Sequence, residues 1–229
     1  MSNPLSPGSV VGTIHSAAAL TAALRLPQGA VDFFELRADA FADKAACARM
    51  ERSLPRLRAP LLLTVRHPQE GGANRLTVAQ RRALYLRFLP VASVVDVELR
   101  SAVALGDVIT AARAQGARVV LSYHDFRKTP TLARLRALRT AAQRTGADVL
   151  KIAAMTNNAR ALCVLLDFLT ERPDAAPALA VMGMGKFGKV SRLVLAQAGS
   201  VLNYGYLDKP QVPGQWSALL LRKRLAENF

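Results

Sequence analysis

The chain has 229 residues, of which 51% are hydrophobic, and its 31 basic and 16 acidic residues give a formal net charge of +15. This length suits one or two domains, and the composition supplies ample material for a large core. No apolar run reaches the roughly 18 residues that a membrane-spanning helix needs, so no membrane partner is expected. The first residues show no secretory signal, and the widely spaced Cys47 and Cys163 suit a reducing compartment, which predicts a cytoplasmic protein.

The excess of basic residues has two interpretations. A basic face attracts the phosphates of nucleic acids, whereas an Arg-rich surface on an ordinary protein binds none. The basic residues are spread along helical stretches, as at Arg134, Arg136, Arg139 and Arg144, and only 6% of the residues are aromatic. Few aromatic side chains leave few platforms on which bases stack. We therefore predict no nucleic-acid partner, and a positive field that favours the approach of a small anionic substrate.

Short apolar strands alternate with helical stretches along the whole chain. Helical periodicity with few Gly or Pro residues marks 77–89, 101–115 and 131–144. Gly116 and Gly146, each directly before an expected strand, are typical of helix C-terminal caps. The eight expected strands span residues 9–14, 31–37, 60–66, 93–99, 117–123, 148–153, 178–182 and 200–204.

Eight strand–helix units of similar length predict an α/β fold, a (β/α)8 TIM barrel that forms a single domain over residues 1–229. An open, doubly wound sheet is the alternative. The count of eight and the absence of a Gly-x-Gly-x-x-Gly sequence after the first strand both favour the barrel.

Strand parity gives the strongest argument about function from the residues alone. Alternate residues of a strand point to opposite faces, and in a barrel one set faces the interior. In five of the expected strands the polar residues share one parity and lie toward the C-terminal end, where barrel enzymes hold their active sites. These residues are, in strand order, Glu35 and Arg37, Thr64 and Arg66, Asp96 and Glu98, Ser122 and His124, and Lys151.

His124 and Lys151 lie on neighbouring strands, and each has two interpretations. A Lys within an apolar strand is either a salt-bridged structural residue or an amine nucleophile that forms a Schiff base. A His at a strand end is either a structural residue or a proton shuttle. For each residue taken alone the structural interpretation is favoured, and their shared location favours the functional one. We expect Asp96 or Glu98, from the preceding strand, to orient the imidazole.

Three loops follow strand ends and carry further candidates. In 66–72, Arg66 and Glu70 form either a binding pair or a solvated ion pair. Glycines in 184–192 expose backbone N–H groups beside Arg192. This segment is either an anion-binding site or a plain loop. The Pro- and Gly-rich loop near 205–215 is either a lid or a plain connection.

An ordered set of segments carries a resemblance to a known family. The chain resembles the type I 3-dehydroquinate dehydratases over nearly its whole length. No single segment is specific to the family. The complete set is specific, because the segments occur in this order and at the expected strand ends. The matching segments are Glu35-Leu36-Arg37-Ala38-Asp39, Arg66 with Glu70-Gly71-Gly72, Asp96-Val97-Glu98-Leu99, Ser122-Tyr123-His124-Asp125-Phe126 before Thr129-Pro130, Lys151-Ile152-Ala153, Met184-Gly185 to Ser191-Arg192, Gly199-Ser200, and Pro213-Gly214-Gln215.

The resemblance implies a hydro-lyase that converts 3-dehydroquinate to 3-dehydroshikimate and water in the shikimate pathway, which leads to aromatic amino acids. It implies a homodimer with no metal or organic cofactor. Lys151 would form an imine with the C3 ketone. His124 would remove a C2 proton and then protonate the departing C1 hydroxyl. The implied substrate-binding residues are Glu35, Arg37, Arg66, Arg192, Gln211 and Gln215, and the implied supporting residues are Glu70, Asp96 and Glu98.

Within that set, Arg192 would bind the substrate carboxylate and Gln215 would close over it from the lid. Asp96 would pair with His124, and Glu70 would tune it. Two positions depart from the family pattern: Gln211 stands where Ser is common, and His67 follows Arg66 where Thr or Ser is common. Two other hypotheses remain: a class I aldolase-like lyase that uses the same Schiff base, and a non-catalytic basic barrel.

Overall fold

The computed structural model describes residues 5–171, 173 and 176–227. Within these residues eight strands form one sheet of parallel pairs, in the order β7-β6-β5-β4-β3-β2-β1-β8. The strands are β1 (Val10–Ile14), β2 (Phe33–Arg37), β3 (Leu61–Thr64), β4 (Val94–Glu98), β5 (Arg118–Asp125), β6 (Val149–Met155), β7 (Ala178–Met184) and β8 (Asn203–Tyr206).

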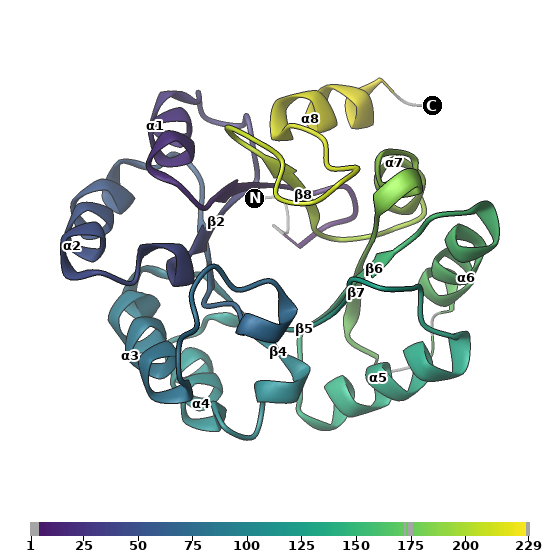
Figure 1. The fold of residues 1–229 in the computed structure, drawn as a ribbon, viewed down its shortest axis with the longest axis horizontal. Helices are drawn as coiled ribbons and strands as arrows, with labels where there is room; N and C mark the ends of the chain where they lie inside the picture. The colour runs from purple at the N-terminus through teal and green to yellow at the C-terminus, as the bar shows by residue number, and fades with distance from the viewer. Residues whose placement is uncertain (1–4, 172, 174–175, 228–229) are drawn as a thin grey trace.

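The two ends of this sheet meet, so that the strands enclose a barrel. The Val201 amide donates to the Leu179 carbonyl at 3.0 Å, and the Val181 amide donates to the Ser200 hydroxyl at 3.0 Å. Figure 1 shows the helices as a ring around the strands, which confirms the predicted (β/α)8 barrel. The helices are α1 (Ala17–Arg25), α2 (Lys44–Ser53), α3 (Val78–Phe88), α4 (Gly106–Ala114), α5 (Leu132–Arg144), α6 (Ala159–Thr170), α7 (Gly188–Gln197) and α8 (Ala218–Ala226).

The buried apolar residues form two separate layers, one inside the barrel and one between the strands and the helices. Phe33 belongs to the inner cluster, whereas its neighbours along the strand, Phe34 and then Leu36, belong to the outer one. The same alternation holds in the other strands, because successive side chains of a strand point to opposite faces. This arrangement confirms the predicted parity. The inner cluster includes Val11, Leu62, Val94, Val120 and Val149 below the polar residues of the same strands.

Two of the three predicted helices agree closely with the structure. Thr77 and Thr131 cap α3 and α5 by accepting hydrogen bonds from backbone amides three residues on. The helix expected over 101–115 begins only at Gly106, because the Ala102 amide bonds the Leu99 carbonyl and the residues before α4 continue as tight turns. Gly116, with φ 80°, ends α4 as predicted.

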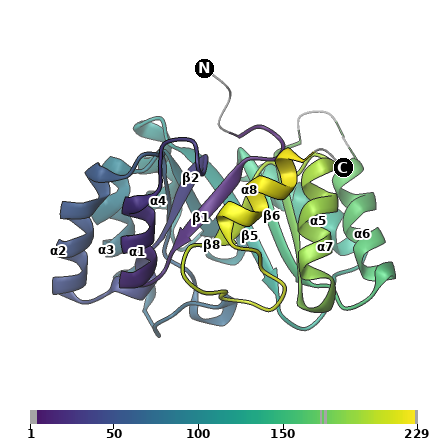
Figure 2. The same ribbon diagram turned by 90° about the horizontal axis from the view of Figure 1, so that it is seen from above.

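The strand boundaries differ from the prediction where the site lies. The structure extends β5 to Asp125 and β6 to Met155, because their parallel pairing continues as far as Asp125 opposite Ala154. His124 therefore lies within a strand rather than after it. The C-terminal strand ends and the loop between β8 and α8, drawn in yellow, face the same end of the barrel in Figure 2. No helix in the described residues is long and apolar enough to cross a membrane.

Candidate active site

A cavity of about 160 Å³ lies at the C-terminal ends of the strands. Its walls hold all the predicted site residues except Asp96 and Glu98, which lie beneath it among the strands. The sheet register contributes to this convergence, since it places Arg37 of β2 opposite Thr64 of β3, and His124 of β5 opposite Ala153, two residues after Lys151 of β6. The predicted residues that line the cavity are Glu35, Arg37, Arg66, Glu70, His124, Lys151, Arg192, Gln211 and Gln215.

Lys151 is buried in the middle of β6, with 4% of its surface exposed. Its Nζ donates to Asp96 Oδ2 at 2.9 Å and lies 3.7 Å from Glu35 Oε1. The same nitrogen lies 3.7 Å from the centre of the Tyr204 ring, whose π face stabilises a cation. Two carboxylates and the face of an aromatic ring therefore surround Nζ. They would favour a protonated imine at the same place.

Asp96 connects Lys151 to Arg66. The Arg66 guanidinium donates to both Asp96 carboxylate oxygens, at 3.2 and 2.8 Å, and to the Ser122 hydroxyl at 2.6 Å. Burial alone would raise the pKa of Asp96, but Arg66 and Lys151 outweigh burial and hold it far below its usual value. Asp96 is thus a permanent negative charge at the cavity floor, where it is shared by two buried cations.

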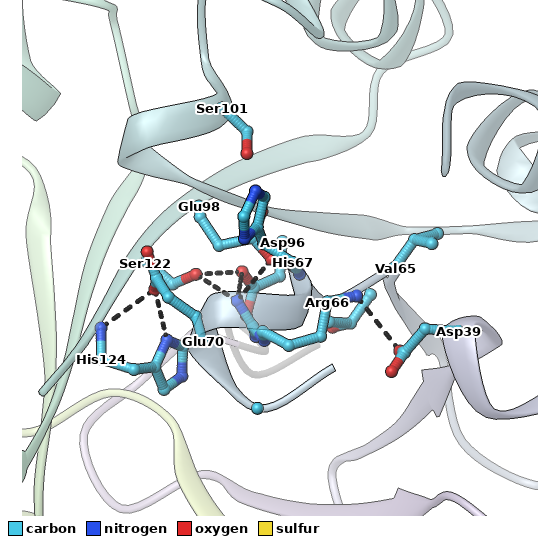
Figure 3. Close-up of polar contacts among 12 residues, drawn as sticks. Asp39, Val65, Arg66, His67, Glu70, Asp96, Glu98, Ser101, Ser122 and His124 are labelled. Atoms are coloured by element: carbon cyan, nitrogen blue, oxygen red, sulfur yellow. Dashed lines mark hydrogen bonds and ion pairs between the residues drawn. The ribbon is translucent and has the colours of Figure 1, made fainter. Parts of the chain in front are cut away.

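His124 pairs with a loop residue and not with a strand carboxylate. Glu70 Oε2 lies 2.9 Å from His124 Nδ1 and accepts the His124 backbone amide at 3.1 Å, as Figure 3 shows. The expectation that Asp96 or Glu98 orients the imidazole is therefore wrong. Asp96 is occupied by Arg66, Lys151 and Ser122, and the loop after β3 brings Glu70 to the ring instead.

The Glu70–His124 pair is tuned toward a neutral imidazole. Burial, assisted by the positive charges of Arg66 and Lys151, holds the pKa of His124 well below its usual value. Burial also raises the pKa of Glu70 to about 7. An ionised Glu70 accepts a hydrogen bond from the Nδ1–H group of His124. The lone pair of the ring is then on Nε2, where it is free to act as a base. This arrangement can serve as a base, with Glu70 setting the tautomer of the ring.

Glu35 and Arg37 form the wall of the cavity on β2. The Glu35 carboxylate accepts hydrogen bonds from the hydroxyls of Thr13, at 3.0 Å, and Thr64, at 2.9 Å. Arg37 binds Asp39 through two nitrogens, at 2.9 and 2.8 Å. Both groups are held in fixed orientations, so each can offer a polar atom to a hydroxylated ligand at little entropic cost.

Arg192 is a buried cation with an unusual set of partners. Its guanidinium donates to the carbonyls of Gly183, at 2.6 Å, Gly188, at 3.2 Å, and Gly214, at 3.1 Å, and it is 2% exposed. Among the described residues no carboxylate pairs with it, and burial lowers its pKa to about 10. A buried, unpaired guanidinium that faces a cavity is suited to a carboxylate ligand.

The loop between β8 and α8 covers the cavity. The Gly185 amide donates to the Pro213 carbonyl at 2.9 Å, which ties this loop to the one after β7. Gly214 has φ 78°, and an added Cβ there would lie 2.5 Å from the Gly185 carbonyl oxygen, so only glycine permits this approach. Gln211 and Gln215 point to the cavity from this loop, and the Gln211 amide donates to Gln215 Oε1 at 2.9 Å.

Glu98 supports the site from below and does not reach the cavity. One of its oxygens accepts from Arg66, at 3.2 Å, and from the His67 amide, at 2.7 Å. The other binds the fully buried Arg81 of α3. Glu98 thereby fixes both the Arg66 side chain and the start of the loop that carries Glu70, and Figure 3 shows these residues together.

Several contributors escaped the sequence prediction. Thr13 and Tyr204 face the cavity from β1 and β8, and strand parity, applied to those two strands, would have found them. Arg81 carried no such signal, because nothing in the helix pattern indicates that this side chain turns inward. Among the described residues no cluster of three His, Cys, Asp or Glu side chains is arranged to hold a metal ion.

Comparisons with known proteins agree with this geometry. The chain matches the family model described as type I 3-dehydroquinase over residues 10–228. A 3-dehydroquinate dehydratase of Pyrococcus abyssi is 32% identical over 199 residues, 86% of this chain and 88% of that protein. One of Thermococcus gammatolerans is 31% identical, covering 94% and 97%. The crystal structure of the Clostridium difficile type I enzyme with covalently modified comenic acid gives a TM-score of 0.85 at 28% identity, covering 96% and 91%.

Proposed function

The chain belongs to the type I 3-dehydroquinase family and is a 3-dehydroquinate dehydratase, a hydro-lyase of the shikimate pathway; we propose that it works through an imine on Lys151, with His124 as the general acid and base. The single observation that carries this mechanism is the shared cavity, in which a buried amine and a neutral imidazole face the same space.

In the first step the Lys151 amine attacks the C3 ketone of 3-dehydroquinate. Its ammonium must first give up a proton, and His124, whose pKa is depressed by burial, is available to accept it. The His124 imidazolium then gives this proton to the carbinolamine hydroxyl, which leaves as water, so that a protonated imine forms on Nζ and His124 is neutral again. Asp96, 2.9 Å from Nζ, remains ionised and stabilises this cation.

The protonated imine acts as an electron sink for the next step. His124 Nε2 removes a proton from C2, and the electron pair moves into the C–N system to give a neutral enamine. The enamine then expels the C1 hydroxyl, to which the imidazolium of His124 gives its proton, so that water leaves. Water adds to the resulting iminium, and the release of 3-dehydroshikimate restores the Lys151 amine. Proton transfer from a positioned side chain typically contributes roughly 10²–10⁴ in rate.

The rest of the cavity fits the substrate. Arg192 is assigned to the substrate carboxylate, because it is a buried guanidinium with only carbonyl partners. Glu35, Arg37 and Arg66 are assigned to the ring hydroxyls. Gln215, from the lid near 205–215, is assigned to the carboxylate beside Arg192, and Gln211 to holding the lid.

We further propose that the protein is a cytoplasmic homodimer. Its formal charge of +15 would favour the approach of the anionic substrate. Exposed apolar side chains on α7 and α8, including Val190, Val194 and Leu219, with exposed fractions of 51%, 37% and 51%, support a dimer interface on this face. Light scattering coupled to size-exclusion chromatography would show a mass near twice that of one chain, and a monomer at micromolar concentration would overturn this assignment.

The activity is tested by following the conjugated enone of 3-dehydroshikimate by its ultraviolet absorbance. Turnover of 3-dehydroquinate is expected, with KM raised at least about tenfold when the substrate carboxylate is replaced by a neutral amide. A Schiff-base aldolase on the same barrel would instead cleave keto sugars and leave 3-dehydroquinate unchanged. A non-catalytic barrel would do neither.

A further inference from the structure

The chain has Gln211 at a lid position where Ser is common in the family, and the structure shows how this longer side chain is used. Gln211 Oε1 accepts from Arg37 Nη1 at 3.2 Å, and Gln211 Nε2 lies 3.1 Å from Nδ1 of His15. The side chain therefore joins the lid to two strands of the barrel, since Arg37 ends β2 and His15 directly follows β1. We call this group of three residues, His15, Arg37 and Gln211, the lid latch.

The chemistry of the latch fixes the direction of each hydrogen bond. A guanidinium only donates, so the amide oxygen of Gln211 must face Arg37 and its NH₂ group must face His15. His15 Nδ1 must then be an acceptor, and the ring proton lies on Nε2. That nitrogen points to Asp208 Oδ1, at 3.5 Å, a buried oxygen with no hydrogen bond from the described residues. Asp208 is itself held by the Ser16 hydroxyl at 2.7 Å.

The latch also orients the residue that closes over the substrate. The Gln211 backbone amide donates to Gln215 Oε1 at 2.9 Å. Because an N–H group can only donate, this bond fixes the Gln215 amide with its oxygen turned toward Gln211. The Gln215 NH₂ group is not used by this bond, and Gln215 lines the same cavity as Arg192.

We propose that His15 is a positioning residue for the reaction: it accepts a hydrogen bond from Gln211, holds the lid closed and thereby orients Gln215 as a donor to the substrate carboxylate. This inference rests on the proposed function for its substrate. His15 touches neither Lys151 nor His124 in the hydrogen bonds and ion pairs of the described residues, so its effect is expected on substrate binding and not on the chemical steps.

The test compares His15→Ala with His15→Asn. Alanine removes the acceptor, whereas the side-chain oxygen of asparagine can occupy the place of Nδ1. His15→Ala is expected to raise KM for 3-dehydroquinate about fivefold, which corresponds to about 1 kcal/mol for one hydrogen bond, with kcat changed less than about twofold. His15→Asn should restore most of the affinity. Val103→Ala, on a fully exposed side chain, is the matched surface control.

A second readout needs no substrate. Trp216 is the only Trp of the chain; it belongs to the lid, and its Nε1 donates to the Lys189 carbonyl at 2.9 Å. Acrylamide quenching of its fluorescence therefore reports how tightly the lid is closed. Quenching should increase in His15→Ala and return toward the wild-type value in His15→Asn.

Gln211→Ser gives an independent test if His15→Ala does not fold. Serine is too short to reach both Arg37 and His15, so this variant loses two hydrogen bonds of the latch and should show at least the rise in KM and in quenching expected for His15→Ala. The double variant should be no worse than Gln211→Ser alone, because the two residues share one hydrogen bond. The proposal is overturned if His15→Ala leaves KM and quenching unchanged, or if His15→Asn is as impaired as His15→Ala. Failure of the wild type to turn over 3-dehydroquinate would overturn the proposed function, whereas Trp216 quenching would still decide the latch.

Discussion

The floor and the roof of the cavity hold their charges in different ways. At the floor, Asp96 of β4 binds both Arg66, just after β3, and Lys151 of β6, and the carboxylates of Glu98 and Glu35 add to the pairing of these two cations. At the roof, Arg192 is equally buried but is held by backbone carbonyls, and the lid that covers it rests on a few hydrogen bonds. A satisfied cluster fixes its members for chemistry, whereas a buried cation without an acidic partner has capacity left for a ligand. We therefore expect floor variants to change kcat or stability, and roof variants to change KM.

The largest effect is expected from His124, which stands between the two regions but works on the chemistry of the floor. His124→Gln keeps a side chain of similar size and removes the base. We expect kcat to fall by roughly 10²–10⁴ while KM changes little. Steady-state kinetics would measure both constants. If kcat/KM fell only as much as the affinity for the substrate, with kcat unchanged, His124 would instead have a binding role.

Removing Asp96 should destabilise the fold itself. Asp96→Ala leaves Arg66 and Lys151 as buried cations without this partner, and breaking a buried pair in this way costs about 3–5 kcal/mol in the free energy of unfolding. Urea denaturation followed by circular dichroism measures the loss. Asp107→Ala is the control, because the exposed Asp107–Arg82 pair should contribute less than about 1 kcal/mol. Similar losses in both variants would contradict the account of the floor.

Replacing Arg192 tests the roof. Arg192→Met keeps the length of the side chain and removes its charge, so the substrate carboxylate loses a charge-assisted partner. We expect KM to rise about tenfold to a hundredfold, with a smaller change in kcat. Arg192→Lys should be intermediate, because an ammonium keeps the charge without the planar fork of donors. An unchanged KM in Arg192→Met would place the carboxylate elsewhere.

The pH dependence of the activity reports on the hydrogen bond between Glu70, in the loop after β3, and His124. Glu70, with its pKa raised to about 7, is ionised above that pH and then holds the proton of His124 on Nδ1. Below it, a protonated Glu70 donates to Nδ1, which moves the ring proton to Nε2 and blocks the base. Activity should therefore fall about tenfold per pH unit below 7. A profile that stays flat from pH 5 to 8 would exclude this arrangement.

The sequence predicted the floor far better than the roof. The alternation of residues in β2 to β6 indicates which side chains point inward. The C-terminal ends of parallel strands lie at the same end of a barrel. The sequence therefore predicted that Glu35, Asp96 and Lys151 lie close together. The partner of His124 could not be predicted in this way, because the position of Glu70 depends on a loop whose path no periodicity sets. His15 and Gln211, which are 196 residues apart, meet only because β8 pairs with β1 in the sheet.

The central claim is that Lys151 carries the substrate as an imine. Sodium borohydride added during turnover of 3-dehydroquinate would reduce such an imine to a stable secondary amine. Mass spectrometry of the intact chain and of its peptides should then show one adduct, located on Lys151, together with loss of activity. The account predicts no adduct and no turnover for Lys151→Ala. Turnover by Lys151→Ala, or an adduct on another lysine of the wild-type chain, would contradict it.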